Sequence, residues 1–146
     1  MEETKQEYMR LKEVFQSFMP YLFAAGRVES FTKKWPYKSP NLSPQKMADA
    51  GFMYSPDPFD PGCVKCPFCL KELSSWEDDD NPMYDIQTFM KKAVYFRNEH
   101  RRYKSRCYFA RLNKSEEQYT VRDVLLLVTN TRAALLVKYW LIYWHL

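Results

Sequence analysis

The chain has 146 residues, of which 17% are aromatic, with four cysteines and a formal net charge of +4 at pH 7. This length fits one domain with an extension. The charged stretch from Met1 to Lys12 excludes a secretory signal, so we expect an intracellular protein whose cysteines serve a metal rather than disulfide bonds.

The N-terminal residues of about 3–19 predict an amphipathic helix, because their apolar positions recur with helical spacing. These apolar residues are Tyr8, Leu11, Phe15 and Met19. Pro20 follows the helix, and Ala24–Gly26 predicts a short link into the next domain.

A second helix is predicted at Gln45–Ala50. Ser43 provides a cap, Pro44 occupies the first turn, and Gly51 closes the helix. The proline-rich segment Tyr54–Gly62 then predicts a loop.

Two short strands are predicted at Cys63–Cys69 and Lys71–Trp76, on either side of a metal-binding turn. Cys66 and Cys69 lie on that turn with C-x2-C spacing, which lets both thiolates reach one tetrahedral metal. His100 and Cys107 from a second segment complete a Cys3His site for one structural zinc ion. The spacing also leaves Cys63-x2-Cys66 as a competing ligand pair.

Charge is distributed unevenly. Glu77–Asp80 contains four successive acids, whereas residues 91–114 contain nine lysines or arginines and a single acid, Glu99. These stretches are either a solvated surface or a ligand site with an acidic and a basic end. Interleaved aromatic residues also leave direct nucleic-acid binding by residues 91–114 open.

The C-terminal region predicts another helix, because Thr120 and Asp123 form a helix-start signature for Val121 onward. From Val128 to Leu146 the sequence becomes aromatic and apolar. A membrane span needs about 18 apolar residues, and we expect Lys138 to leave this run too short. The tail is then a core helix, a partner-binding helix or a read-through end.

Several motifs occur in a diagnostic order along the chain. They are Arg27-x3-Phe31, Trp35-Pro36, Met47-Ala48-x-Ala50-Gly51-Phe52-x-Tyr54, Cys66-x2-Cys69-x3-Leu73-x2-Trp76, Asp79-Asp80-Asn81-Pro82, Glu99-His100 and Cys107-x-Phe109. This order resembles the BIR domain of the inhibitor-of-apoptosis family, and a single BIR followed by a helix resembles its survivin-like members. The register of Phe68 and Leu73-x2-Trp76 within the family favours the Cys66–Cys69 pair.

The resemblance implies an α+β fold, in which zinc staples a three-stranded antiparallel sheet with short helices between N-terminal and C-terminal helices. The implied division is residues 1–20 for the N-terminal helix, 27–112 for the BIR domain and 119–146 for the C-terminal helix. The segment at about 84–97 is extra relative to the family. It is either a true insertion or a retained intron, because its ends are compatible with splice-site codons.

The resemblance also implies a groove that binds the N-terminus of a partner peptide. The matching positions are Lys71, Glu72, Leu73, Trp76, Asp79 and Asp80. Possible phosphate contacts are Arg101, Arg102 and Lys104. Ser74 and Tyr103 depart from the survivin-like pattern, where a Glu and a His stand.

The function implied is a non-enzymatic scaffold that places the chromosomal passenger kinase complex on chromatin in mitosis by recognising a histone tail. Implied partners are inner centromere protein, borealin and Aurora kinase, with a homodimer possible and no membrane. Implied locations are the nucleus and centromere, the spindle midzone and the cytoplasm.

The alternative function is that of an apoptosis inhibitor that binds caspases or their antagonists. A cysteine hydrolase using Cys63 or Cys107 is disfavoured, because a buried metal thiolate is not a free nucleophile.

Overall fold

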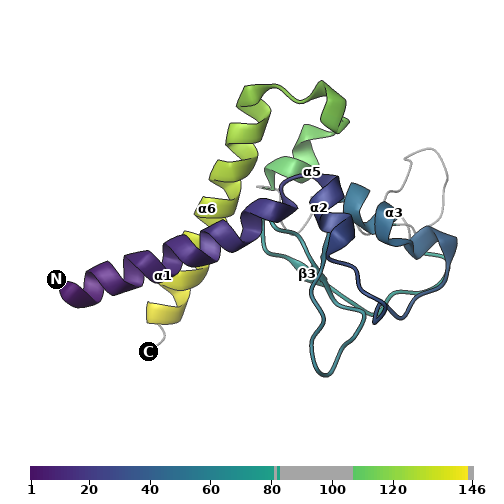
Figure 1. Ribbon diagram of the computed structural model, residues 1–146, viewed down its shortest axis with the longest axis horizontal. Coiled ribbons are helices and arrows are strands. Elements are labelled where there is room, and N and C mark those ends of the chain that lie inside the picture. Colours follow the sequence, from purple (N-terminus) through teal and green to yellow (C-terminus); the bar gives the residue numbers. More distant parts are fainter. Residues whose placement is uncertain (81, 83–106, 145–146) are drawn as a thin grey trace.

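The computed structural model describes residues 1–80, 82 and 107–144, with side chains described as far as Leu141. The elements in chain order are α1 (Glu2–Phe18), η1 (Met19–Tyr21), α2 (Ala24–Glu29), η2 (Pro40–Leu42), α3 (Pro44–Asp49), β1 (Met53–Tyr54), β2 (Val64–Lys65), β3 (Glu72–Leu73), α5 (Tyr108–Leu112), η3 (Glu116–Gln118) and α6 (Val121–Trp144). The sheet and the short helices pack together, and the long helices α1 and α6 cross each other beside them (Figure 1).

The sheet is three-stranded and antiparallel in the order β1-β2-β3, which confirms the expected α+β class. Its register pairs Tyr54 with Val64 and Val64 with Leu73, so these residues lie side by side across the strands. Tyr54 and Val64 are buried, and Leu73 packs against the core that they join.

The strands are shorter than the sequence predicted. Cys66–Cys69 forms a turn closed by a 2.8 Å hydrogen bond from the Leu70 N–H to the Cys66 carbonyl. Leu70 and Ser75 have φ values of 64° and 61°, and such left-handed residues cannot continue a strand. The predicted loop Tyr54–Gly62 is wrong at its first residue, because Tyr54 belongs to β1 and pairs with Val64 of β2.

Helix α3 (Pro44–Asp49) begins and ends one residue earlier than the predicted Gln45–Ala50, and the predicted cap and first-turn proline are confirmed. The Ser43 hydroxyl accepts the Lys46 N–H at 3.3 Å, and Pro44 occupies the first turn. Gly51 follows the helix with φ +95°, a conformation that side chains rarely adopt. A Cβ at Gly51 would also overlap the Phe109 ring, so this position needs glycine for two independent reasons.

The segment Ala24–Gly26 is helical, so its assignment to a link was wrong. It opens α2, which packs against α3 and η1. A Cβ at Gly26 would collide with the Pro20 carbonyl oxygen, so the glycine allows α2 to approach η1 closely. Helix propensity alone disfavours glycine within a helix, so tertiary packing decides that Gly26 lies in α2.

Arg27 on α2 is the largest buried polar side chain among the described residues. Its guanidinium donates to the carbonyl oxygens of Tyr21, Leu22 and Ala48 at 3.0, 2.9 and 2.8 Å. It also pairs with Glu116 at 3.4 Å. Burial lowers the pKa of Arg27 and the Glu116 carboxylate opposes that shift, so a charged guanidinium joins η1, α3 and η3 to α2.

Helix α6 docks on the domain through one stripe of buried residues, Leu127, Thr131 and Leu135, spaced four apart. It packs on α5 and on α1, where the Arg132 guanidinium lies 4.5 Å from the Phe15 ring centroid. The interpretation as a core helix therefore holds for this stripe. Leu136, Val137 and Trp140 on the same helix are each more than half exposed.

The expectation that Lys138 leaves the apolar run too short for a membrane was wrong. Val121–Leu141 is long and apolar enough by length and composition alone, with a mean hydropathy of 1.3. One lysine does not offset the surrounding leucines and aromatic residues. This composition is weak support for a membrane-spanning helix, because a helix that packs on a soluble domain can have the same composition. The absence of a membrane partner stays a prediction.

Candidate metal centre and neighbouring strand edge

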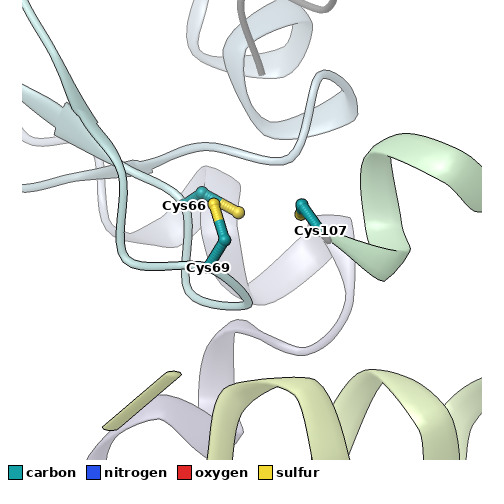
Figure 2. A group of neighbouring side chains, drawn as sticks. All are labelled: Cys66, Cys69 and Cys107. Carbon is teal, nitrogen blue, oxygen red and sulfur yellow. The ribbon is translucent and has the colours of Figure 1, made fainter. Parts of the chain in front are cut away.

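Cys66, Cys69 and Cys107 lie together in the interior of the domain. Their sulfur atoms are all within 4.8 Å of one another, and all three residues are buried. Cys66 and Cys69 project from the turn after β2, and Cys107 faces them from the start of α5 (Figure 2). One small cation could therefore contact all three sulfur atoms.

The backbone around the cysteines explains how the turn is held. The Cys66 N–H donates to the Lys71 carbonyl at 2.9 Å, which ties the first residue of the turn to the residue that precedes β3. On the opposite side, the Cys107 carbonyl accepts the Arg111 N–H at 3.2 Å and so begins α5. Each ligand-bearing segment is thus fixed by local hydrogen bonds.

The thiols of Cys66 and Cys107 stay protonated in the absence of a cation. Burial raises the pKa of the Cys66 thiol well above its usual value, and hydrogen bonds with Cys107 and Cys69 raise it further. The hydrogen bond with Cys66 lowers the pKa of Cys107, but the bond with Cys69 and burial outweigh it and raise that pKa to about 12. Such thiols ionise together only when a cation neutralises them, and sulfur ligands suit zinc.

Cys63 is not a member of this cluster. It is buried separately, with its thiol directed at the Val64 carbonyl at 3.8 Å. Burial raises the pKa of Cys63, as do the nearby carboxylates of Glu72 and Asp60. The competing pair Cys63-x2-Cys66 is therefore not supported by the geometry, and neither is Cys63 as an activated nucleophile.

The predicted groove residues begin at the edge of the sheet. Glu72 and Leu73 form β3, and Lys71 directly precedes them. Glu72 pairs with Lys65 of the neighbouring strand at 3.1 Å. Among the described residues β3 pairs with β2 alone, and the edge of a sheet is where an extended peptide can add as a further strand.

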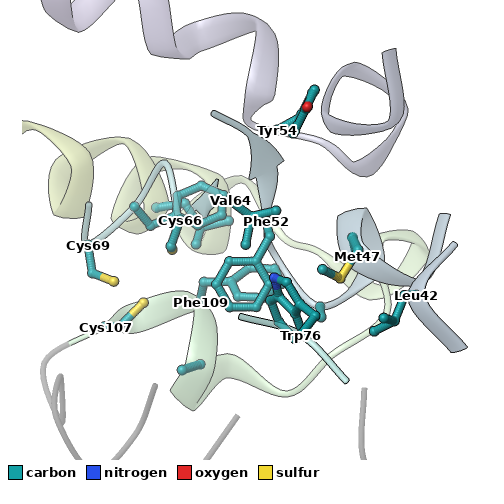
Figure 3. Close-up of a cluster of buried hydrophobic side chains, with 14 of the residues drawn as sticks. Leu42, Met47, Phe52, Tyr54, Val64, Cys66, Cys69, Trp76, Cys107 and Phe109 are labelled. Atoms are coloured by element: carbon teal, nitrogen blue, oxygen red, sulfur yellow. The ribbon is translucent and has the colours of Figure 1, made fainter. Parts of the chain in front are cut away.

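The side chains of Trp76 and Asp80 are more buried than expected for residues that line a binding groove. Trp76 is 5% exposed, and its ring packs edge-on against Phe52 at 6.2 Å (Figure 3). The Asp80 carboxylate is directed into its own turn, where it accepts the Glu77 N–H at 2.7 Å. Asp79 is exposed. The groove roles of Trp76, Asp79 and Asp80 stay predictions.

Other predicted site residues lie outside the described residues. They are the fourth metal ligand His100, the phosphate contacts Arg101, Arg102 and Lys104, and the extra segment at about 84–97. Both explanations of that segment, an insertion and a retained intron, therefore remain open.

Sequence reasoning missed two polar residues of α6 beside the metal centre. The Thr131 hydroxyl donates to the Pro67 carbonyl at 3.1 Å, and the Asn130 side-chain oxygen accepts the Tyr108 N–H at 2.5 Å. Both residues belong to the polar run Thr129–Arg132, which interrupts the apolar sequence of the helix, and that interruption was the available signal. Periodicity could not show which residues they would meet.

Comparison with known sequences is consistent with this geometry. The family described as BIR: Inhibitor of Apoptosis domain matches residues 27–111. Baculoviral IAP repeat-containing protein 5.2-A of Xenopus laevis is 35% identical over 102 residues, 69% of this chain and 55% of that protein. Baculoviral IAP repeat-containing protein 5 of Cavia porcellus is 35% identical over 100 residues, 68% of this chain and 60% of that protein. The chain thus matches little more than half the length of these relatives.

Proposed function

Because the chain belongs to the BIR, or Inhibitor of Apoptosis domain, family and is survivin-like, we propose that it is a zinc-dependent peptide-binding and scaffold subunit without enzymatic activity. Its proposed task is to place the chromosomal passenger kinase complex on chromatin in mitosis by recognising the N-terminus of a histone tail. The observation that carries the proposal is the position of the buried thiol cluster close to β3, which is the edge strand of the sheet in the described part of the chain.

Zinc would be held by Cys66, Cys69 and Cys107, with His100 as the proposed fourth ligand. When bound, the metal supplies folding free energy and no open coordination position, as in other sites with four protein ligands. The metal-binding turn Cys66–Cys69, called the metal turn below, leads through Leu70 into β3. Holding the turn would therefore hold the edge strand in the orientation that a peptide needs.

A peptide would add to this edge as a further strand. Its terminal ammonium would then approach the acidic turn that follows β3, where Glu77, Asp78 and Asp79 are exposed. Carboxylates stabilise an ammonium by charge-assisted hydrogen bonds, whereas an acetylated terminus offers no positive charge. This contrast is the signature expected of N-terminal recognition.

The proposed partners are inner centromere protein, borealin and Aurora kinase, with a second copy of the chain possible. Exposed apolar residues of α6, such as Leu125 and Val137, suit association with other helices. The proposed locations are centromeric chromatin, the spindle midzone and the cytoplasm.

The alternative proposal is inhibition of apoptosis through the same groove. It is favoured by the description of the matching family as an Inhibitor of Apoptosis domain. Caspases or their antagonists would then take the place of the histone tail at the edge of β3. Both proposals share one metal site and one peptide edge, so they differ in the ligand.

The test is a titration of the zinc-loaded chain with a labelled peptide that begins Ala-Arg-Thr and carries phosphothreonine. The matched control is the same peptide with an acetylated N-terminus, and Asp79→Asn is the protein variant. Free-amine binding that is lost on acetylation and weakened by Asp79→Asn supports histone-tail recognition. Equal binding of both peptides contradicts it, and inhibition of a purified caspase without peptide binding favours the alternative.

A further inference from the structure

Helix α6 contacts both segments that bear the candidate metal ligands. Thr131 reaches the turn between Cys66 and Cys69, because its hydroxyl donates to the Pro67 carbonyl at 3.1 Å. Thr131 is 1% exposed and Pro67 is fully buried, so water cannot replace this bond. The metal turn therefore has a hydrogen-bond donor that comes from 64 residues away in the sequence.

The second contact reaches the segment of Cys107. The Asn130 side-chain oxygen accepts the N–H of Tyr108, the first residue of α5, at 2.5 Å. Cys107 precedes that helix with an extended backbone. Asn130 thus satisfies a helix-start N–H that the local sequence leaves open. Adjacent residues of one helix consequently hold both sides of the thiol cluster.

The contact of Thr131 differs from the usual behaviour of threonine in a helix. Its hydroxyl also lies 3.3 Å from the Leu127 carbonyl, so one donor is shared between the helix and the metal turn. Thr129 shows the purely local arrangement, because its exposed hydroxyl donates to the Leu125 carbonyl at 2.8 Å. The bond to Pro67 is therefore a tertiary contact and is not required by the helix itself.

We propose that Asn130 and Thr131 are positioning residues of the metal centre, and that zinc binding and the docking of α6 are thermodynamically coupled. The inference rests on the zinc site of the proposed function. Groups that orient metal ligands through hydrogen bonds typically change metal affinity about 10- to 100-fold when removed. Such coupling is reciprocal. If docked α6 raises the affinity for zinc by some factor, bound zinc raises the equilibrium constant for docking of α6 by the same factor.

The test compares Thr131→Val with Thr129→Val in the full chain, with zinc affinity measured by competition with a chromophoric chelator. The two substitutions make the same chemical change on the same helix, and only the first removes the bond to Pro67. Thr131→Val should weaken zinc binding about 10-fold or more, while Thr129→Val should leave it unchanged. Thr131→Ser keeps the hydroxyl and should restore most of the affinity.

Asn130 provides a second pair of variants. Asn130→Leu removes the acceptor for the Tyr108 N–H and should also weaken zinc binding. Asn130→Asp keeps an oxygen in place and should bind zinc more tightly than Asn130→Leu. Equal zinc affinity for Thr131→Val, Thr129→Val and the parent would overturn the inference while leaving the zinc site intact.

Amide hydrogen exchange of the parent provides the reciprocal measurement, which does not depend on any variant folding. Stripping zinc should speed exchange in the Leu127–Leu135 part of α6, and zinc should restore its protection. Identical exchange there with and without zinc overturns the coupling. A parent that binds no zinc overturns the zinc site itself, together with the inference that depends on it.

Discussion

The rings of Phe68 and Phe109 stack with centroids 5.1 Å apart and an interplanar angle of 10°. Phe68 lies between Cys66 and Cys69, whereas Phe109 lies two positions after Cys107. The Arg27 guanidinium covers both rings, with distances of 5.7 and 5.3 Å to their centroids. The two ligand-bearing segments are therefore joined by an aromatic contact that does not depend on a metal.

Replacing Phe109 with alanine should destabilise the fold strongly. The change removes a buried ring, leaves a cavity and breaks the stack with Phe68, and buried Phe→Ala changes cost about 3–5 kcal/mol. The free energy of unfolding in denaturant measures the effect. Phe59→Ala is the matched control, because Phe59 is 96% exposed and should change stability by less than about 0.5 kcal/mol. Similar losses for both variants would contradict the core assignment.

Cysteine variants should separate the metal ligands from the spare thiol. Native mass spectrometry of the parent should show one zinc ion. Cys107→Ser should lose it, because a neutral hydroxyl is a poor replacement for a zinc-bound thiolate. Cys63→Ser should keep the zinc ion, since Cys63 lies outside the sulfur cluster.

His100→Ala extends the same measurement to the predicted fourth ligand. Loss of zinc in this variant would support the Cys3His site and would show that the extra segment at about 84–97 is tolerated. Zinc loss caused by Cys63→Ser but not by Cys69→Ser would instead favour the competing ligand pair.

Replacing Gly51 with alanine should destabilise the protein for two reasons. The φ of +95° strains an L-residue, at a cost of about 1–3 kcal/mol, and the added Cβ meets the Phe109 ring. Gly51→Asn separates these contributions, because asparagine tolerates positive φ better but still carries a Cβ. Thermal unfolding should rank the parent above Gly51→Asn, and Gly51→Asn above Gly51→Ala. Parent-like stability for Gly51→Ala would contradict the packing of Phe109 on this glycine.

Asp123 should make stability depend on pH. Hydrogen bonds from the Thr120 N–H and the Lys114 ammonium, with a further one from Tyr108, lower the pKa of this carboxyl well below its usual value. An unfolded aspartate titrates near about pH 4, so the stabilisation is complete above that range. It is lost as the pH falls from there towards the lower folded pKa.

The measurement compares the unfolding of the parent and Asp123→Asn between neutral and acidic pH. The difference in stability between them should be largest near neutral pH and should shrink in acid as the parent loses its carboxylate. Zinc release in acid affects both proteins and cancels in the difference. A difference that stays constant with pH would exclude Asp123 as the titrating group.

Local sequence predicted the helix starts well. At α3 and α6 the capping residues lie within three positions of the N–H groups that they satisfy, as the bonds at Ser43 and Thr120 show. The same holds for the Cys66–Cys69 turn. Such signals are readable because the interacting groups are neighbours in the chain. The overall BIR fold was instead predicted from the resemblance of the motif order to that family.

Strand ends and the helical nature of Ala24–Gly26 could not be predicted in this way. The strands end at left-handed residues such as Leu70 and Ser75, neither of which is a residue type that favours that conformation. Gly26 fits within α2 because only a residue without a Cβ lets the helix pass so close to the Pro20 carbonyl. These outcomes depend on packing against distant segments, which residue-by-residue preferences do not contain.

The sequence by itself determined the family, the ligand types and the chemistry of the metal turn, because thiolates at C-x2-C spacing can reach one cation wherever the turn lies. Tertiary structure alone decided that Cys63 lies outside the thiol cluster and that Trp76 is buried. It also decided that Asn130 and Thr131 of α6 form hydrogen bonds with the segments that carry the cluster. These are relations between residues tens of positions apart. Their free energies arise only when folding removes water from both partners and fixes their orientation.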